Sequence, residues 1–186
     1  MHSLFVVALA ATLAFVGTMF DNFFAFAAQL VLSERERHAR VSWAHAASIT
    51  LLVIVAAGVG SVLSAIPLRL VGLLAVAPLA LAIHAFRHRV TRPQYRRGIV
   101  ATFALTFSLG GDNIAVWVPL LRASGVGHGA LTVAIFALWE LIFLLGAQAL
   151  ARHERVVAWG EQFAPTFMPW LYLALSVAVL LECHTL

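Results

Sequence analysis

The chain has 186 residues, of which 62% are hydrophobic and only 11% are charged, with a mean hydropathy of +0.96. A soluble domain is nearer half apolar and a quarter charged, so composition excludes an ordinary soluble protein and predicts an all-α, polytopic membrane protein. The net charge of +4 comes from arginines in loops between apolar segments, where positive charge sets membrane topology, so we expect no nucleic-acid partner.

Six apolar segments predict six transmembrane helices. In chain order they are residues 4–32, 41–65, 68–86, 98–121, 130–151 and 166–181. Stretches of roughly 20 apolar residues suit a hydrocarbon core about 30 Å thick. The most basic stretch divides the segments three and three. We therefore expect a first three-helix repeat over residues 1–86, a basic cytoplasmic linker over 87–97 and a second three-helix repeat over 98–186.

The arginines predict the topology. The loops after the first, third and fifth segments hold all of them except Arg69 and Arg122. The positive-inside rule places those loops in the cytoplasm and both termini outside. The expected location is a prokaryotic inner or plasma membrane. Three helices per repeat is an odd number, so the second repeat must be inserted upside down relative to the first, which predicts an inverted repeat.

Two dipeptides lie deep inside apolar segments: Asp21-Asn22 and Asp112-Asn113. The chain has no other aspartate or asparagine. An ionised carboxylate at membrane depth is costly and usually functional. Asp21 lies about 11 residues, or roughly 16 Å of helix, from its cytoplasmic end, and Asp112 about 14 residues, or roughly 21 Å. Both are therefore near the middle of the membrane, and a spacing of about 91 residues suggests a duplicated site.

We expect the first and fourth helices to be broken at these dipeptides. Gly110-Gly111 immediately precedes Asp112, and Gly17 and Thr18 precede Asp21. A broken helix exposes backbone carbonyls that can bind a cation at membrane depth. The alternative is that each Asp-Asn pair only caps a half-helix.

Two facing carboxylates repel each other unless a divalent cation or a proton lies between them. This chemistry suits a site that exchanges a metal ion for protons. The predicted metal ligands are Asp21, Asn22, Asp112 and Asn113. Further groups that could contribute hydroxyls or backbone oxygens are Thr18, Thr106, Ser108, Gly110 and Gly111.

Five other polar residues are candidates for a functional role. Glu140 lies near the centre of the fifth segment and is the candidate for proton coupling, the alternatives being a partner of the metal site or an ion pair at a dimer contact. His45 and His84 lie near segment ends, where a wet interfacial position is expected. Cys183, the only cysteine, excludes an intrachain disulfide, and with His184 gives only a weak signal for a soft metal.

The run Gly110 to Leu120, GGDNIAVWVPL, resembles the second signature of the CadD-type cadmium resistance transporters, in the LysE-like exporter superfamily. The run Thr18 to Asn22, TMFDN, is similar to the first signature, in which a threonine precedes two acidic residues. Here Asn22 replaces the second acid and removes one negative charge. The resemblance implies efflux of Cd²⁺ or Zn²⁺ from the cytoplasm. Manganese exporters and TerC-like proteins share the paired acidic residues.

The sequence is compatible with several functions. Oxygen ligands alone would favour Mn²⁺ or Ca²⁺ over Cd²⁺. A LysE-like exporter of a small organic solute would also use broken helices. A non-transporting sensor or membrane enzyme is the third class, although the chain has no HExxH motif or nucleophile constellation. The expected partners are the metal ion and the lipid bilayer, no cofactor is expected to be bound permanently, and size alone allows a homodimer.

Overall fold

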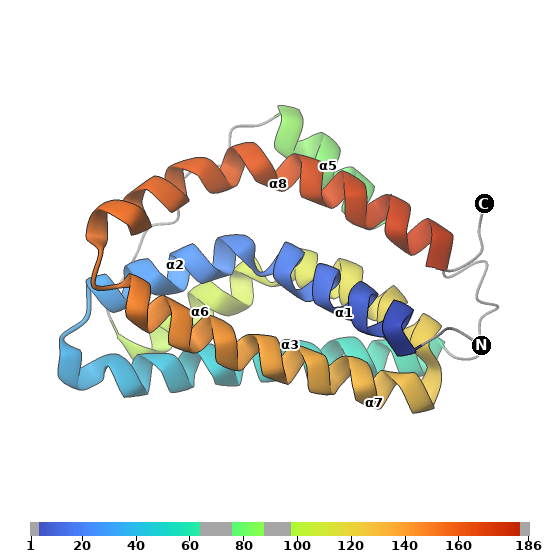
Figure 1. Ribbon diagram of the computed structural model, residues 1–186, viewed down its shortest axis with the longest axis horizontal. Coiled ribbons are helices and arrows are strands. Elements are labelled where there is room, and N and C mark those ends of the chain that lie inside the picture. The colour runs from blue at the N-terminus through green and yellow to red at the C-terminus, as the bar shows by residue number, and fades with distance from the viewer. Residues whose placement is uncertain (1–3, 64–75, 88–97, 183–186) are drawn as a thin grey trace.

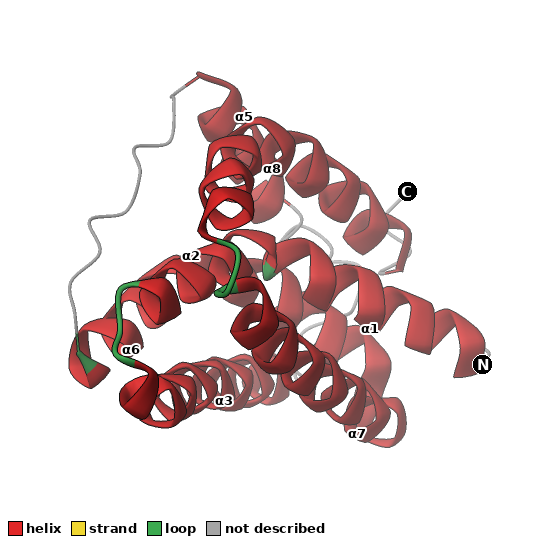
Figure 2. Cartoon of the chain, turned by 60° about the vertical axis from the view of Figure 1, so that its left-hand side comes forward, coloured by secondary structure: helices red, strands yellow, loops and turns green. Residues whose placement is uncertain are grey.

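The computed structural model describes residues 4–63, 76–87 and 98–182. Within these ranges all regular secondary structure is helical and no strand is present (Figure 1, Figure 2). The elements are α1 (Leu4–Thr18), α2 (Phe20–Val31), the 3-10 turn η1 (Arg35–Arg37), α3 (His38–Val62), α5 (Val76–Arg87), α6 (Ile99–Leu109), α7 (Gly111–Leu150) and α8 (Glu154–Glu182).

The first and fourth predicted segments are both broken helices, as expected. The axes of α1 and α2 differ by 50° across Met19, and those of α6 and α7 differ by 56° across Gly110. Each residue at a break has backbone angles in the bridge region, with φ −90° and ψ 2° at Met19 and φ −81° and ψ 8° at Gly110. In the first segment the break therefore falls one residue after the predicted Gly17-Thr18 pair.

The short turn predicted between the fourth and fifth segments is centred on one residue. Gly125 has φ 64° and ψ −178° inside α7. Glycine adopts this positive φ readily because it has no Cβ. The chain therefore reverses at one residue instead of over residues 122–129.

Two helices are long and apolar enough to cross a membrane alone, covering residues 35–62 and 127–150. Each bent pair can supply one more span, so the described part of the chain gives up to four. The predicted sixth segment lies within α8. Residues 68–75 of the predicted third segment, and nearly all of the basic linker over 87–97, lie outside the described residues.

The helices form two layers. Helices α5 and α8 pack against each other above the rest, and α8 also covers α2 (Figure 1). Below them, α1 packs on α7, while α3 packs on both α6 and α7. The core between these helices is a cluster of buried apolar side chains at the level of the breaks. Its largest members are Phe15, Met19, Leu52, Trp117 and Phe136.

Apolar side chains also cover the outside of the bundle. Ile54, Leu138, Leu141 and Leu145 are all more than half exposed. So large an apolar surface needs a partner, and in a membrane the lipid chains provide it. The structure is therefore that of a multi-pass membrane protein.

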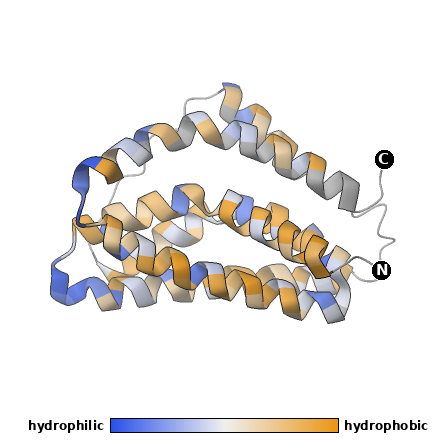
Figure 3. Cartoon of the chain, viewed as in Figure 1, coloured by the Kyte–Doolittle hydropathy of each residue, from blue (hydrophilic) through white to orange (hydrophobic). Residues whose placement is uncertain are grey.

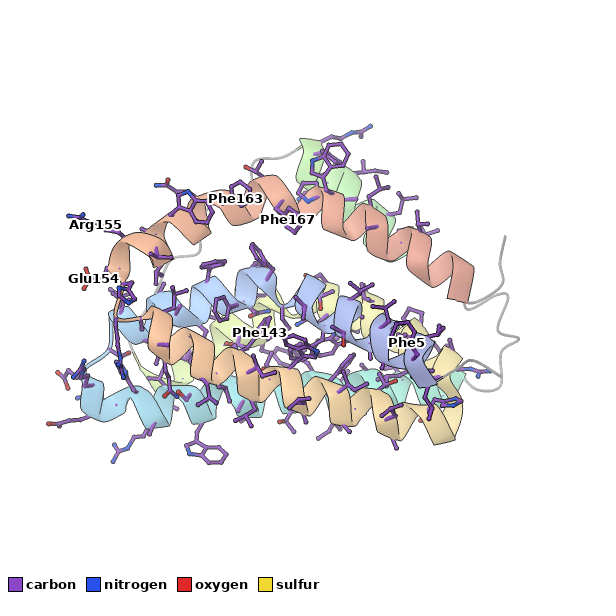
Figure 4. All side chains as sticks on the ribbon, in the orientation of Figure 1. Phe5, Phe143, Glu154, Arg155, Phe163 and Phe167 are labelled. Carbon is purple, nitrogen blue, oxygen red and sulfur yellow. The ribbon has the colours of Figure 1, made fainter. Side chains whose placement is uncertain are left out.

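Hydrophilic residues gather at one end of the bundle (Figure 3). This end holds η1 and the connection between α7 and α8, where Glu154 and Arg155 lie (Figure 4). The loops after the first and fifth segments thus share one end, while α1 begins and α8 ends at the opposite end (Figure 1). We call the end that holds η1 and the connection between α7 and α8 the arginine-rich end.

Gly110 allows α3 to approach the break in the fourth segment. A Cβ at Gly110 would collide with the fully buried side chain of Leu52, whereas a Cβ at Gly111 would meet nothing. We predict that Gly110→Ala lowers the stability of the detergent-solubilised protein by about 1–3 kcal/mol through overpacking. Gly111→Ala, the matched control, should leave thermal unfolding unchanged or raise its midpoint.

A double-variant cycle tests the cause. Because Leu52→Ala removes the colliding atoms, Gly110→Ala should cost less stability in that background than in the wild type. Equal costs in both backgrounds would show that the contact with Leu52 is not what requires glycine at this position.

Candidate metal site

The two aspartates occupy equivalent positions after the two breaks. Asp21 is the second residue of α2, and Asp112 is the second residue of α7. One carboxylate oxygen of Asp21 accepts the backbone N–H of Asn22 at 2.7 Å, and one of Asp112 accepts that of Asn113 at 2.9 Å. The N-terminus of a helix also favours negative charge. Each break therefore compensates part of the cost of holding a carboxylate in an apolar bundle.

The contact of 3.4 Å between Met19 Sδ and Asn113 Nδ2 joins the two breaks, and the charges of Asp21 and Asp112 repel each other when both are ionised. Asp112 is buried, with 5% of its surface exposed, and Asp21 is half-buried. The N-cap residues are Met19 and Gly110, and neither helix has a side-chain cap, so each aspartate accepts only the N–H of the next residue inside the first turn. This hydrogen bond explains one carboxylate at each break. It does not explain why two carboxylates should lie together, because the repulsion opposes folding.

The two asparagines bring unpartnered amide atoms to the same level of the bundle. Asn22 and Asn113 are both almost fully buried. Asn113 Nδ2 donates to the sulfur of Met19 at 3.4 Å, but its Oδ1 has no hydrogen-bond partner, and neither does either amide atom of Asn22. Buried amides without partners are uncommon because they lose hydration and gain nothing in return. A ligand bound here would have these groups available.

The other predicted site residues do not all reach this position. Thr18 is buried and donates to Ala14 O in its own helix at 2.9 Å. Ser108 is exposed and donates to Leu105 O at 2.8 Å, so the structure does not bring its hydroxyl to the buried aspartates. Gly110 forms the break and Gly111 opens α7. Within the described ranges no three His, Cys, Asp or Glu side chains gather, so neutral groups would have to complete a metal site.

The prediction for His45 was wrong. It is not at a wet interface: only 1% of its surface is exposed, and its ring stacks on Phe26 with centroids 4.2 Å apart. Its Nδ1 lies 2.9 Å from the hydroxyl oxygen of Thr106, and its Nε2 lies 3.6 Å from Oε1 of Glu140. The predicted role of Thr106 as a metal ligand therefore competes with this hydrogen bond.

A sequence signal for His45 existed. Val41, His45, Ser48 and Leu52 recur at helical spacing and all face the interior of the bundle. Distance from the segment end, on which the prediction rested, does not identify that face. His84 is exposed, as expected, and Cys183 and His184 lie outside the described residues.

Glu140 is a second acidic side chain that the bundle buries, besides Asp112. Only 9% of its surface is exposed, and neither carboxylate oxygen has a hydrogen-bond partner. It lines a cleft of about 310 Å³ between α3 and α7, whose other walls are largely apolar. The approach of His45 is thus the main polar contact that the structure offers this carboxyl group.

Buried polar and aromatic side chains lie on both sides of the aspartates. Toward the arginine-rich end the buried residues include Gln29, whose Oε1 is 3.4 Å from the hydroxyl of Thr102, along with the contacts of His45. Toward the opposite end Phe15 stacks on Trp117, with centroids 5.6 Å apart and planes 5° from parallel. Phe136 packs against both rings, and Phe143 points from α7 into the same region (Figure 4).

The contact between Thr106 and His45 generates a stability prediction. Thr106→Val keeps the shape of the side chain but leaves Nδ1 of a buried histidine without its partner, which should cost about 1–3 kcal/mol. Ser108→Ala, two residues away on an exposed face, is the matched control and should change little. Thermal unfolding in one detergent measures both, and equal midpoints for the two variants would show that the hydrogen bond contributes nothing.

Comparison with known proteins gives one family. The model of the family described as "Cadmium resistance transporter" matches residues 15–186, which include both helix breaks, both Asp-Asn pairs and Glu140. Neither curated proteins nor solved structures gave a significant match. The match confirms the family that the sequence resembles. With its apolar helices and two broken spans, the chain is a membrane transporter that belongs to the cadmium resistance transporter family.

Proposed function

We propose that the protein exports Cd²⁺, with Zn²⁺ as a further substrate, from the cytoplasm in exchange for protons. The observation that carries the proposal is the juxtaposition of Asp21 and Asp112 at two helix breaks. A divalent cation between the two carboxylates cancels their charge, and two protons do the same when the ion leaves. The membership of a cadmium resistance family supports the choice of ion.

The ligands that we propose come from both breaks. Asp21 and Asp112 supply the charged oxygens, and the buried, unpartnered carbonyl oxygens of Asn22 and Asn113 supply neutral ones. The carbonyl ends of α1 and α6 carry partial negative charge toward the breaks. Gly110 and Gly111 would contribute backbone rather than side-chain atoms.

The proposed architecture is a pair of inverted repeats with six spans, residues 1–86 and 98–186, joined by a cytoplasmic linker. The pattern of helix contacts supports it. The packing of α1 on α7 corresponds to that of α6 on α3, and the packing of α2 on α8 corresponds to that of α7 on α5. A two-fold axis in the membrane plane relates such pairs. The proposed orientation has the arginine-rich end in the cytoplasm and both termini outside.

We propose that Glu140 carries the coupled proton and that His45 assists it. A protonated Glu140 is neutral and tolerates its apolar surroundings, whereas an ionised one needs the positive charge that a protonated His45 would supply. The separation of 3.6 Å between them allows that pairing with little movement. The carboxylates of Asp21 and Asp112 remain the groups that hold the metal.

A second candidate is export of Mn²⁺ or Ca²⁺. The observation in its favour is the donor set of Asp21, Asn22, Asp112 and Asn113, which is entirely oxygen, and oxygen donors suit these harder ions.

The central test is metal uptake into inside-out proteoliposomes. Vesicles with an acidic lumen would be offered Cd²⁺, Zn²⁺, Mn²⁺ and Ca²⁺ in turn, with and without the pH gradient. We expect gradient-driven uptake of Cd²⁺ by the wild type and its loss in Asp21→Asn and in Asp112→Asn, because each variant removes one of the two charges that balance the ion. Glu36→Gln, in the exposed turn η1, is the matched control.

The outcomes separate the candidates. Uptake of Mn²⁺ or Ca²⁺ without Cd²⁺ would favour the second candidate. Uptake retained in both aspartate variants, with correct insertion in the membrane, would rule out the central site, and no metal uptake at all would favour an organic solute.

Glu140→Gln tests the proton route separately. The glutamine keeps the size of the side chain but cannot release a proton, so we predict that Cd²⁺ uptake loses its response to lumenal acidification while Cd²⁺ binding to the detergent-solubilised protein persists. Glu36→Gln again serves as the control. Loss of binding in Glu140→Gln would instead make Glu140 part of the metal site.

A further inference from the structure

Met19 brings a sulfur atom to a site that otherwise offers only oxygen. It is the single residue between α1 and α2, two positions before Asp21, and its side chain is fully buried. Its Sδ lies 3.4 Å from Nδ2 of Asn113, the residue next to Asp112. The thioether is therefore close in sequence to Asp21 and in contact with the residue next to Asp112.

The amide groups of the two asparagines have atoms that are free to bind a ligand. The Oδ1 atom of Asn113 and both amide atoms of Asn22 are buried without partners. The thioether itself is only a weak hydrogen-bond acceptor, so the contact with Asn113 Nδ2 is easily exchanged for a stronger one. Because the thioether is neutral, it also leaves unchanged the balance of charge between a divalent ion and the two carboxylates.

We propose that Met19 Sδ is a ligand of the transported ion and gives the site its preference for Cd²⁺ over Mn²⁺ and Ca²⁺. Thioether sulfur is a soft donor, and it favours soft ions over those that prefer carboxylate and carbonyl oxygen. It also holds them less tightly than a thiolate would, which suits a transporter that must release its ion. This inference rests on the proposed function and assigns the residue that determines its specificity.

The competing explanation is packing. Met19 belongs to the core cluster with Phe15, Leu52 and Trp117, and methionine often fills irregular gaps in such cores. Leucine has a similar volume and no sulfur, so the two explanations predict different outcomes for Met19→Leu. A packing role predicts a small and equal effect on all ions, whereas a ligand role predicts a loss for Cd²⁺ alone.

The first test is competition between ions. Met19→Leu and the matched control Met168→Leu, in α8, would be compared in a Cys183→Ala background, which removes the only thiol. We expect Met19→Leu to lower the affinity for Cd²⁺ roughly tenfold relative to that for Mn²⁺ or Ca²⁺, with the control unchanged. A uniform loss for every ion would overturn the ligand role and support packing.

The second test observes the bond. In selenomethionine-labelled protein, X-ray absorption at the cadmium edge should detect a selenium neighbour of Cd²⁺, which should persist in Met168→Leu and disappear in Met19→Leu. Transport of Cd²⁺ by a protein with no selenium neighbour would overturn this inference alone. A wild type that neither binds nor transports Cd²⁺ would overturn the proposed function together with it.

Discussion

The placement of two carboxylates, Asp21 and Asp112, inside an apolar bundle is the constraint on which the rest of the structure depends. Removing an ion from water costs several kcal/mol even after relaxation, and the charges of the two aspartates repel each other when both are ionised. Each carboxylate regains only about 1.5–3 kcal/mol from the N–H that it accepts. The helix breaks therefore reduce the cost of holding the two carboxylates without cancelling it, and in the proposed function a divalent ion or protons supply the remainder.

The break beside Asp112 and the side chain of Glu140 are linked through one short segment of α6. Thr106 lies one helical turn before the break at Gly110, and its hydroxyl contacts His45, whose other ring nitrogen approaches Glu140. These contacts connect the break beside Asp112 to the surroundings of Glu140, which lies later in α7, without a direct bond between the two carboxyl groups.

Sequence reasoning located the breaks and the aspartates because both signals are local: a charge inside an apolar run, and glycine beside it. It failed where the answer depended on which face of a helix meets its neighbours. His45 was misplaced for this reason, and Ser108 lies on an exposed face of α6 although it is close to Asp112 in sequence. The sulfur of Met19 carries no hydropathy signal that separates a ligand from core packing. Only the approach of Asn113 from the other half of the chain singles it out.

The stacked rings of Phe15 and Trp117, with Phe136 against them, also have a consequence for the exit of an ion. In the proposed function, an ion held between the aspartates would meet these rings on the side away from Gln29 and His45. In the proposed orientation these rings lie on the outer half of the bundle. Export of an ion from between the aspartates would therefore require the stacked rings to separate.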